Sequence, residues 1–459
     1  TTSHPARTSP FHLCYWLIFC VIIRNLLPHS LVGARIMDPP TPSARIAHGH
    51  NPTSLSAHTL PAHPYAPFTR PDYPLTIYEH LKCTLCLITI TPIRLIVSVV
   101  SLLAVYLGFL VLFRIVWRGK TCINDLSQRQ FAVFSRIMRV VVRFALFLWG
   151  FYWMEVVHVK RDSKDKRGQL SNASPPHQLG QGEPAPESSL HPAFLYQNGH
   201  EYHLAHSTLC SPPPFIIISN HLSLLDVFFC LNEFGPVSFL SRHALLKIPF
   251  FNKWMHLINC LFVRDDETSE GKKKLVAHIN ERQAEYYEKV SQLPGGSIPP
   301  PPSRLVIFPE GTTTNGQYLI SFHKGAFAAG EPVQPMFVHH PFEHFSPSWE
   351  TIPLSVYIFR LACQFYNRVQ IYHLPIYYPS EEEKGDPHLY SRNVRQWMKD
   401  TVNKQTSHFY LETIESTRKD KTIYHSEIVK GLYRWNELPW ERSAPTTGYR
   451  KLPRETVQI

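Results

Sequence analysis

The stretch FIIISNHLSLLD, residues 215–226, decides the fold together with a second stretch, LVIFPEGT, at residues 305–312. In each, a short apolar run is followed by turn-forming and polar residues, a pattern typical of a buried strand and the turn that ends it. Binding and catalytic groups of α/β proteins tend to lie at the carboxyl ends of strands. We therefore expect His221, Asp226 and Glu310 to lie just beyond two strands of a central sheet.

Length and composition bound the domain organisation. A chain of 459 residues could hold two or three domains, but its 40 prolines and uneven composition indicate fewer ordered residues, so we expect one catalytic domain plus membrane segments. The net charge of +11 suits an anionic membrane surface or a nucleic acid equally well. Composition alone therefore leaves the partner open.

An apolar segment favours the membrane. Residues 95–113 carry no charge and are bounded by Arg94 and Arg114. At about 1.5 Å per residue they nearly match a hydrocarbon core of about 30 Å, and such a run is rare as a core helix of a soluble domain. Residues 144–157 are shorter and more charged, so we predict an interfacial or re-entrant helix there. Basic residues are denser after residue 113, which places the catalytic part in the cytosol.

Two motifs and the sequence after them carry a resemblance. His221 and Asp226 form His-x-x-x-x-Asp, and residues 308–312 read Phe-Pro-Glu-Gly-Thr. In this order the pair resembles the signature of the glycerolipid (PlsC-like) acyltransferase family, and similarity over roughly residues 77–398, interrupted once, extends to its lysophosphatidylcholine and lysophosphatidylethanolamine acyltransferase branch. The resemblance implies an α/β domain with a mixed central sheet flanked by helices and preceded by membrane-embedded helices.

The resemblance also implies an activity: transfer of a fatty acyl group from acyl-CoA to the free hydroxyl of a lysophospholipid in phospholipid remodelling, at the endoplasmic reticulum membrane. Such a transfer needs a base for the hydroxyl proton, and His221 fits because the pKa of histidine lies near working pH. Asp226 would accept a hydrogen bond from the other ring nitrogen. Five residues rotate a helix by about 140°, so the two side chains meet only if His221 lies at or before the first turn, and Asn220 favours a helix start there.

No Gly-x-Ser-x-Gly elbow is present in the sequence, which favours direct attack in a ternary complex over a covalent serine intermediate. We expect acyl-CoA as a co-substrate, no separate cofactor and no metal. His339, His340 and His344 lack the His-Glu-x-x-His spacing of a zinc site and are interpreted as a loop.

By the resemblance, Glu310, Gly311 and Thr312 would bind the glycerol and phosphate part of the acceptor. Arg264 would meet the phosphate, although it stands one residue earlier than in this branch, a shift that turns an extended side chain to the opposite face. Lys324, one place later than in the family pattern, is a further candidate.

The predicted organisation has five parts. They are a disordered leader at 1–75 with a possible hydrophobic segment at 11–23, membrane-associated helices at 76–158, a flexible insertion at 159–212, the acyltransferase domain at 213–398 and a C-terminal tail at 399–459. The true start could be Thr1 or Met37.

Three alternatives to the leading hypothesis remain open at this point. One is a 1-acylglycerol-3-phosphate acyltransferase of phospholipid synthesis, because the motifs do not specify the headgroup. Another is a catalytically inactive, membrane-shaping relative, which the intact motifs oppose. A nucleic-acid-binding protein is disfavoured by the apolar segment at 95–113. Acyl-chain preference and oligomeric state are not encoded in these motifs.

Overall fold

The computed structural model describes residues 63–72, 76–117, 119–161, 213–247, 251–264, 268–291 and 304–431. The predicted hydrophobic segment at 11–23 lies outside the described residues, as does nearly all of the predicted insertion at 159–212.

Helices and strands alternate along the described chain. The helices are α2 (Ile77–Ile88), α3 (Ile90–Val111), α4 (Gln128–Leu148), α5 (Asp226–Phe234), α6 (Phe251–Leu257), α7 (Ser269–Ser291), α8 (Leu354–Ala362), α9 (Glu381–Gly385), α10 (Pro387–Gln405) and α11 (Arg418–Val429). The strands are β1 (Glu155–His158), β2 (Ile216–Ser219), β3 (Ser238–Arg242), β4 (Leu261–Val263), β5 (Leu305–Ile307), β6 (Tyr318–Leu319), β7 (Val333–His339), β8 (Gln370–His373) and β9 (Glu412–Thr413).

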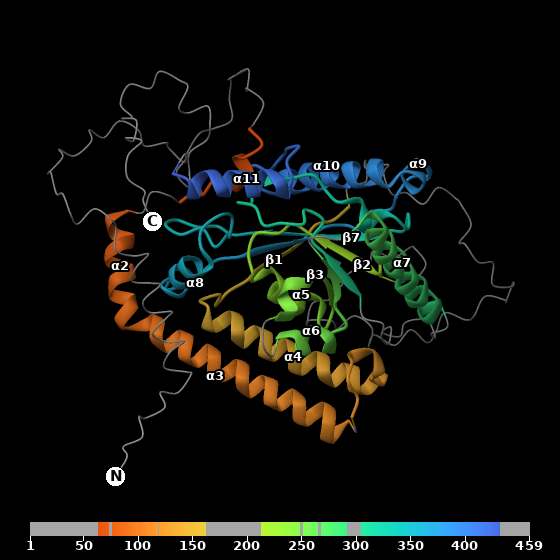
Figure 1. The fold of residues 1–459 in the computed structure, drawn as a ribbon, viewed down its shortest axis with the longest axis horizontal. Coiled ribbons are helices and arrows are strands. Elements are labelled where there is room, and N and C mark those ends of the chain that lie inside the picture. The colour runs from red at the N-terminus through yellow and green to blue at the C-terminus, as the bar shows by residue number, and fades with distance from the viewer. Residues whose placement is uncertain are drawn as a thin grey trace, which may run out of the picture.

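A seven-stranded sheet in the order β1-β8-β7-β2-β5-β3-β4 forms the centre of the structure (Figure 1). Neighbouring strands are parallel except β7 and β8, which are antiparallel. The expected mixed central sheet with flanking helices is confirmed. Strands β2 and β5 fall within a residue of the two predicted apolar runs, and they are direct neighbours, with Ile217 paired to Val306. Their carboxyl ends therefore meet at one edge of the sheet.

The alternating side chains of β2 supply both hydrophobic cores. Ile217 belongs to a core with residues of α4 and α5, whereas Ile216 and Ile218 belong to a second core with residues of α7 and α10. This follows from the period of two in a strand, and it explains why β2 reads as a continuous apolar run: both of its faces are covered. Figure 1 shows α10 and α11 on one side of the sheet and α3 and α4 on the other.

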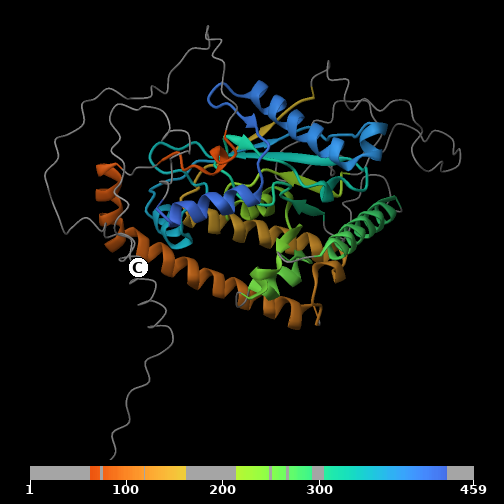
Figure 2. The ribbon, with the colours of Figure 1, turned by 45° about the horizontal axis from the view of Figure 1, so that its top comes forward.

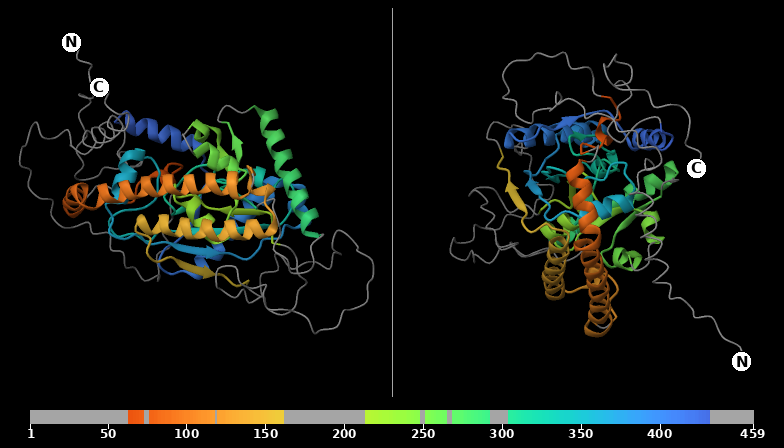
Figure 3. Two further views of the ribbon diagram at one scale, coloured as in Figure 1. Left: turned by 90° about the horizontal axis from the view of Figure 1, so that it is seen from below. Right: turned by 90° about the vertical axis from the view of Figure 1, so that its left-hand side faces the viewer.

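Helix α3 is the outermost helix on its side of the sheet (Figure 2) and lies beside α4 (Figure 3). It begins five residues before the predicted segment and includes Arg94, whose guanidinium donates hydrogen bonds to Ala362 O at 3.0 Å and Phe365 O at 3.1 Å. Among the described residues, one helix, Ile90–Arg114, is long and apolar enough to cross a membrane. Only 6% of its apolar 18-residue stretch is buried inside the protein.

The prediction of an interfacial helix at residues 144–157 is wrong. Residues 144–148 complete α4, and Glu155–His158 form β1, which pairs in parallel with β8. Arg143 fixes the corner between them by donating hydrogen bonds to the carbonyls of Phe151 and Tyr152 at 2.7 and 2.5 Å. The apolar run therefore spans a helix end, a turn and an edge strand.

Residues 63–72, placed by the sequence in a disordered leader, pack against the domain. The guanidinium of Arg70 is fully buried and contacts Asp72, Glu350 and the carbonyls of Ser346 and Ser348 at 2.6–3.1 Å. A buried arginine of this kind is stable only because its charge is paired with carboxylates and both of its Nη atoms are hydrogen-bonded. The leader prediction missed this segment because its partners lie more than 270 residues away in the sequence.

The predicted boundary at residue 398 falls inside α10, so the domain continues beyond it. Tyr424 and Ile428 of α11 pack with Phe68, Ile320 and Ile414 in a small apolar cluster. The chain after residue 398 therefore contributes packed structure up to α11, and no simple tail begins there.

The pairing of Arg70 predicts a large loss of stability in Arg70→Met. Removing one member of a buried ion network leaves the carboxylate of Glu350 without its cation, at a cost of about 3–5 kcal/mol. We expect a lower free energy of unfolding in detergent. The matched control is Lys274→Met, whose pair with Glu270 is more than three-quarters exposed and whose loss costs at most about 1 kcal/mol. Equal effects of the two substitutions would contradict the assignment.

Candidate active site

The loop after β2 is anchored through Asn220. Its side-chain amide donates to Val338 O at 2.9 Å, and its carbonyl accepts from Val338 N–H at 2.7 Å, so the end of β2 is tied to β7. The sequence suggested that a helix starts at Asn220. This is wrong, because α5 begins at Asp226 with Leu225 as its N-cap. His221 thus lies before the first turn, the placement required for it to meet Asp226.

His221 and Asp226 form a hydrogen-bonded pair. His221 Nδ1 lies 2.8 Å from Asp226 Oδ2, which also accepts the backbone N–H groups of Leu222 at 2.6 Å and Ser223 at 2.8 Å. A carboxylate can only accept, so Nδ1 carries the proton and Nε2 keeps a free lone pair. The His221 side chain is 21% exposed, and its ring stacks on Phe308 with centroids 4.2 Å apart. The arrangement is that of a base and the residue that orients it.

Asp226 is held as a carboxylate. Burial alone would raise its pKa, but the hydrogen bond from His221 and the imidazole of the nearby His340 lower the pKa well below the usual range. His340 is buried, with Nε2 3.9 Å from Asp226 Oδ1 and Nδ1 donating to Arg368 O at 3.2 Å. Asp226 therefore stays ionised at neutral pH and can stabilise a protonated His221.

Glu310 lies beneath the catalytic pair and is fully buried. Its Oε1 accepts the backbone N–H of His221 at 2.9 Å, and its Oε2 accepts the N–H of Ile320 at 3.3 Å. Burial raises the pKa of Glu310 to about 8, against the effect of these two hydrogen bonds, and the nearby charge of Asp226 raises it further. In this structure the carboxyl group joins the turns after β2 and β5.

Gly311 and Thr312 form the outer part of the same turn. Gly311 is exposed and has φ +67°, and a Cβ atom there would lie 2.8 Å from His323 Nε2. Only glycine satisfies both conditions. Thr312 is half-buried, so these two residues present an accessible surface beside the buried Glu310.

The two predicted cationic residues lie apart from the catalytic pair. Arg264 is exposed just after β4, three strands from β2, which corresponds to roughly 14 Å at about 4.8 Å per strand. Lys324 is exposed, and its amine lies 3.1 Å from His388 Nε2 on α10. The structure thus brings together His221, Asp226 and Glu310. It leaves Arg264 three strands away from β2, and it places the amine of Lys324 beside His388 of α10.

Two backbone contacts that the sequence did not indicate complete the loop. Thr314 N–H donates to His221 O at 2.9 Å, and Trp349 N–H donates to Leu222 O at 2.7 Å. Both are hydrogen bonds between main-chain groups, so they cannot be predicted from the residue types in the sequence. Together with the bond from His221 N–H to Glu310, they fix the backbone of His221 and Leu222.

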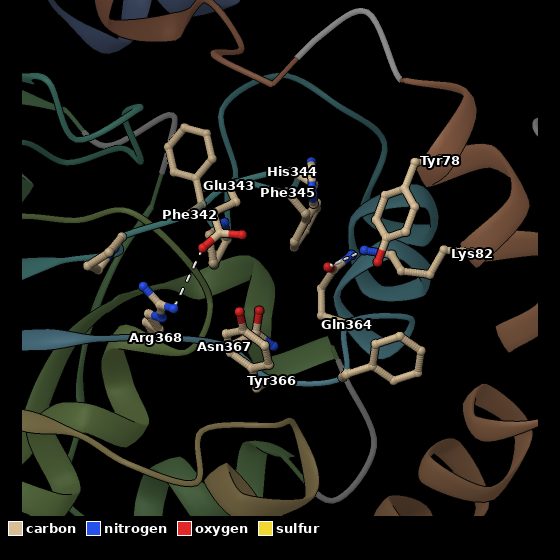
Figure 4. A pocket seen from close by; sticks show the side chains of 13 residues that line it. Tyr78, Lys82, Phe342, Glu343, His344, Phe345, Gln364, Tyr366, Asn367 and Arg368 are labelled. Carbon is tan, nitrogen blue, oxygen red and sulfur yellow. Dashed lines mark hydrogen bonds and ion pairs between the residues drawn. The ribbon is translucent and has the colours of Figure 1, made fainter. Parts of the chain in front are cut away.

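A pocket of about 180 Å³ lies beside this site, between α2, the loop after β7 and the segment before β8 (Figure 4). Arg368 and Glu343 face each other across one side, with Arg368 Nη2 3.6 Å from Glu343 Oε1. Tyr78 and Lys82 of α2 form the opposite side. The pocket adjoins the catalytic pair through His340, which bonds the Arg368 carbonyl and faces Asp226.

Known proteins match this chain over most of its length. The acyltransferase family model matches residues 204–339. Lysophospholipid acyltransferase LPEAT1 from Arabidopsis thaliana is 31% identical over 79% of this chain and 86% of that protein. Lysophosphatidylcholine acyltransferase 1 from Danio rerio is 28% identical over 70% of this chain and 50% of that protein. The crystal structure of PlsC, a 1-acyl-sn-glycerophosphate acyltransferase from Thermotoga maritima, aligns with 67% of this chain and 97% of its own, at 15% identity and a TM-score of 0.32.

The identity to LPEAT1 extends over nearly the whole of that protein, and both signature motifs fall within the matched family region. The chain is therefore an acyltransferase that belongs to the PlsC-like family, in its lysophospholipid acyltransferase branch.

Proposed function

We propose that this protein transfers a fatty acyl group from acyl-CoA to the free hydroxyl of a lysophospholipid, with lysophosphatidylcholine or lysophosphatidylethanolamine as the acceptor. The observation that carries the proposal is the 2.8 Å contact between His221 Nδ1 and Asp226 Oδ2, in a histidine whose side chain is 21% exposed. The names of the matched relatives support the choice of acceptor.

The pair performs the proton transfers of the reaction. His221 Nε2 removes the hydroxyl proton as the acceptor oxygen attacks the thioester carbonyl, and Asp226 stabilises the imidazolium that forms. Collapse of the tetrahedral intermediate breaks the carbon–sulfur bond, and the proton on His221 passes to the departing thiolate of coenzyme A. Each turnover leaves His221 neutral again, so no covalent enzyme intermediate is needed.

The acceptor would bind over the turn after β5. Gly311 and Thr312 are accessible there, and the absence of a side chain at Gly311 permits close approach of a ligand to the backbone. Glu310 supports this surface from below through its bonds to His221 and Ile320. Arg264 and Lys324 stand farther out, where they can attract the phosphate group electrostatically before it reaches the turn.

The membrane side of the protein would be formed by α2, α3 and α4. Their outward faces expose a continuous set of large apolar side chains: Ile77, Leu81, Leu85, Ile88, Ile93, Ile96, Val99, Val100, Leu102, Leu103, Leu107, Val111, Val133, Ile137, Val140, Phe144 and Phe147. A soluble surface rarely carries so large an apolar patch. We place the enzyme at the endoplasmic reticulum on the strength of the family resemblance alone. The catalytic domain would face the cytosol, because basic residues are denser after α3 than before it.

Replacing the base tests the mechanism. In membranes containing the full chain, His221→Ala should lower the rate of acyl transfer from labelled oleoyl-CoA by about 10²–10⁴-fold, the usual contribution of general base catalysis. Asp226→Asn should also reduce the rate, because an amide does not stabilise the imidazolium. The exposed His425 on α11 provides the control His425→Ala. Unchanged transfer in His221→Ala would contradict the mechanism.

A panel of acceptors in the same assay tests the substrate class. We expect lysophosphatidylcholine or lysophosphatidylethanolamine to be acylated faster than lysophosphatidic acid. Preference for lysophosphatidic acid would instead support the synthetic pathway, and no transfer to any acceptor would support a non-catalytic relative.

The raised pKa of Glu310 predicts a pH-dependent stability. The unfolded carboxyl ionises near 4.5 and the folded one at about 8, so the folded protein binds more protons between these values and loses stability as pH rises across them. Glu310→Gln cannot ionise, so its free energy of unfolding should improve relative to wild type from about pH 5 to about pH 8. Denaturant titrations check this, with the exposed Glu381→Gln as control. Parallel pH profiles for wild type and Glu310→Gln would contradict the buried, protonated carboxyl.

The apolar face of α3 predicts membrane association that charge can weaken. Leu103→Glu combined with Leu107→Glu should shift the protein from the membrane pellet to the supernatant during alkaline extraction, because a charge near a helix centre costs about 2.5–3.5 kcal/mol in lipid. Val429→Glu, at an exposed position of α11, should leave the distribution unchanged. Equal pellet fractions in all three proteins would exclude α3 as the membrane contact.

A further inference from the structure

The turn after Glu310 is held by a side chain from outside the matched acyltransferase region. Lys421 on α11 places its amine 2.8 Å from Thr313 O and 2.7 Å from Thr313 Oγ1, with Trp349 O at 3.5 Å. Thr313 Oγ1 uses its own proton to bond Trp349 O, so it can only accept from the amine. Three acceptors match the three N–H groups of an ammonium, whereas a neutral amine has two.

The backbone beside these acceptors supports the catalytic loop. Thr314, next to the residue that Lys421 contacts, donates its N–H to His221 O. Trp349, whose carbonyl faces the amine, donates its N–H to Leu222 O. Lys421 therefore contacts two segments that are each hydrogen-bonded to the loop carrying His221. Loss of the Lys421 hydrogen bonds would weaken the support of both segments for this loop.

We propose that Lys421 is a positioning residue for acyl transfer, whose ammonium holds Thr313 and Trp349 together so that His221 stays aligned with Asp226. The inference rests on the proposed function and extends it to the C-terminal helix α11. A small displacement of a base from its reacting geometry lowers the reaction rate strongly. A residue that holds the base in place from a distance therefore has a measurable effect on turnover.

The charge of Lys421 is sensitive to pH near neutrality. Burial lowers the pKa of the amine to about 7; nearby carboxyl groups of Glu350 and Glu310 raise it, and the positive charges of Arg418 and Arg242 lower it. The ammonium thus loses a proton on the alkaline side of neutrality, and the clamp then has one donor fewer than its three acceptors. We expect turnover to fall with rising pH in that range.

The test compares pH profiles of kcat and KM for the full chain in membranes, between about pH 6 and about pH 9. Lys421→Met should lower kcat by roughly tenfold to hundredfold, with little change in KM for acyl-CoA, and should lack the alkaline fall in activity. Lys421→Arg should keep most of the activity and move the alkaline fall to higher pH, because arginine remains protonated. Lys419→Met, at an exposed lysine of the same helix, should match wild type.

Two results would overturn the inference. One is a Lys421→Met protein with wild-type kcat. The other is a Lys421→Arg protein whose alkaline fall stays at the wild-type pH, which would assign the fall to another group such as Glu310. If Lys421→Met does not fold, the profile of Lys421→Arg decides alone. An inactive wild type contradicts the proposed function, whereas an active wild type with an unaffected Lys421→Met contradicts only the role of Lys421.

Discussion

The buried carboxylate of Asp226 is the group around which the rest of the site is built. Its carboxylate accepts hydrogen bonds from the His221 ring and from the backbone N–H groups of Leu222 and Ser223. One side chain therefore both orients the base and fixes the conformation of the loop that carries it. A buried carboxylate without such donors would be costly. The hydrogen bond from His221 lowers the pKa of Asp226, and the N–H groups of Leu222 and Ser223 shape the loop around the same oxygen. Catalytic geometry and local stability have the same physical origin here.

Much of the fold could be predicted from local sequence, because β2 and β5 are buried on both faces and read as apolar runs ended by polar turns. The pairing of His221 with Asp226 was also predictable, since both lie within one loop. The segments misread were those whose structure depends on distant partners. The edge strand that begins at Glu155 forms because β8 pairs with β1, and Arg70 is held by groups near residue 350 as well as by Asp72.

The role of Glu310 shows a different limit of sequence reasoning. Its motif predicted a residue that meets the acceptor, yet both carboxyl oxygens accept backbone N–H groups, one from His221 after β2 and one from Ile320 after β6. A motif records which residue type is required at a place, whereas only coordinates show whether the requirement comes from the ligand or from the protein. In the proposed function, the surface that remains for the acceptor is that of Gly311 and Thr312, and Glu310 links this turn to the backbone of His221.

A series of buried ion pairs also connects the site to the proposed membrane surface. Buried ion pairs lead from the helix with the exposed apolar face to the loop beside His221: Glu79 of α2 meets Arg360, Arg360 meets Asp72, Asp72 meets Arg70, and Arg70 meets Glu350. Glu350 follows Trp349, which holds the backbone of Leu222. Buried pairs add little net stability but fix geometry, since each member is costly to leave unpaired. In the proposed function a lipid acceptor would enter from the bilayer, and the chain of ion pairs between α2 and the loop after β2 would hold His221 at a constant distance from that surface.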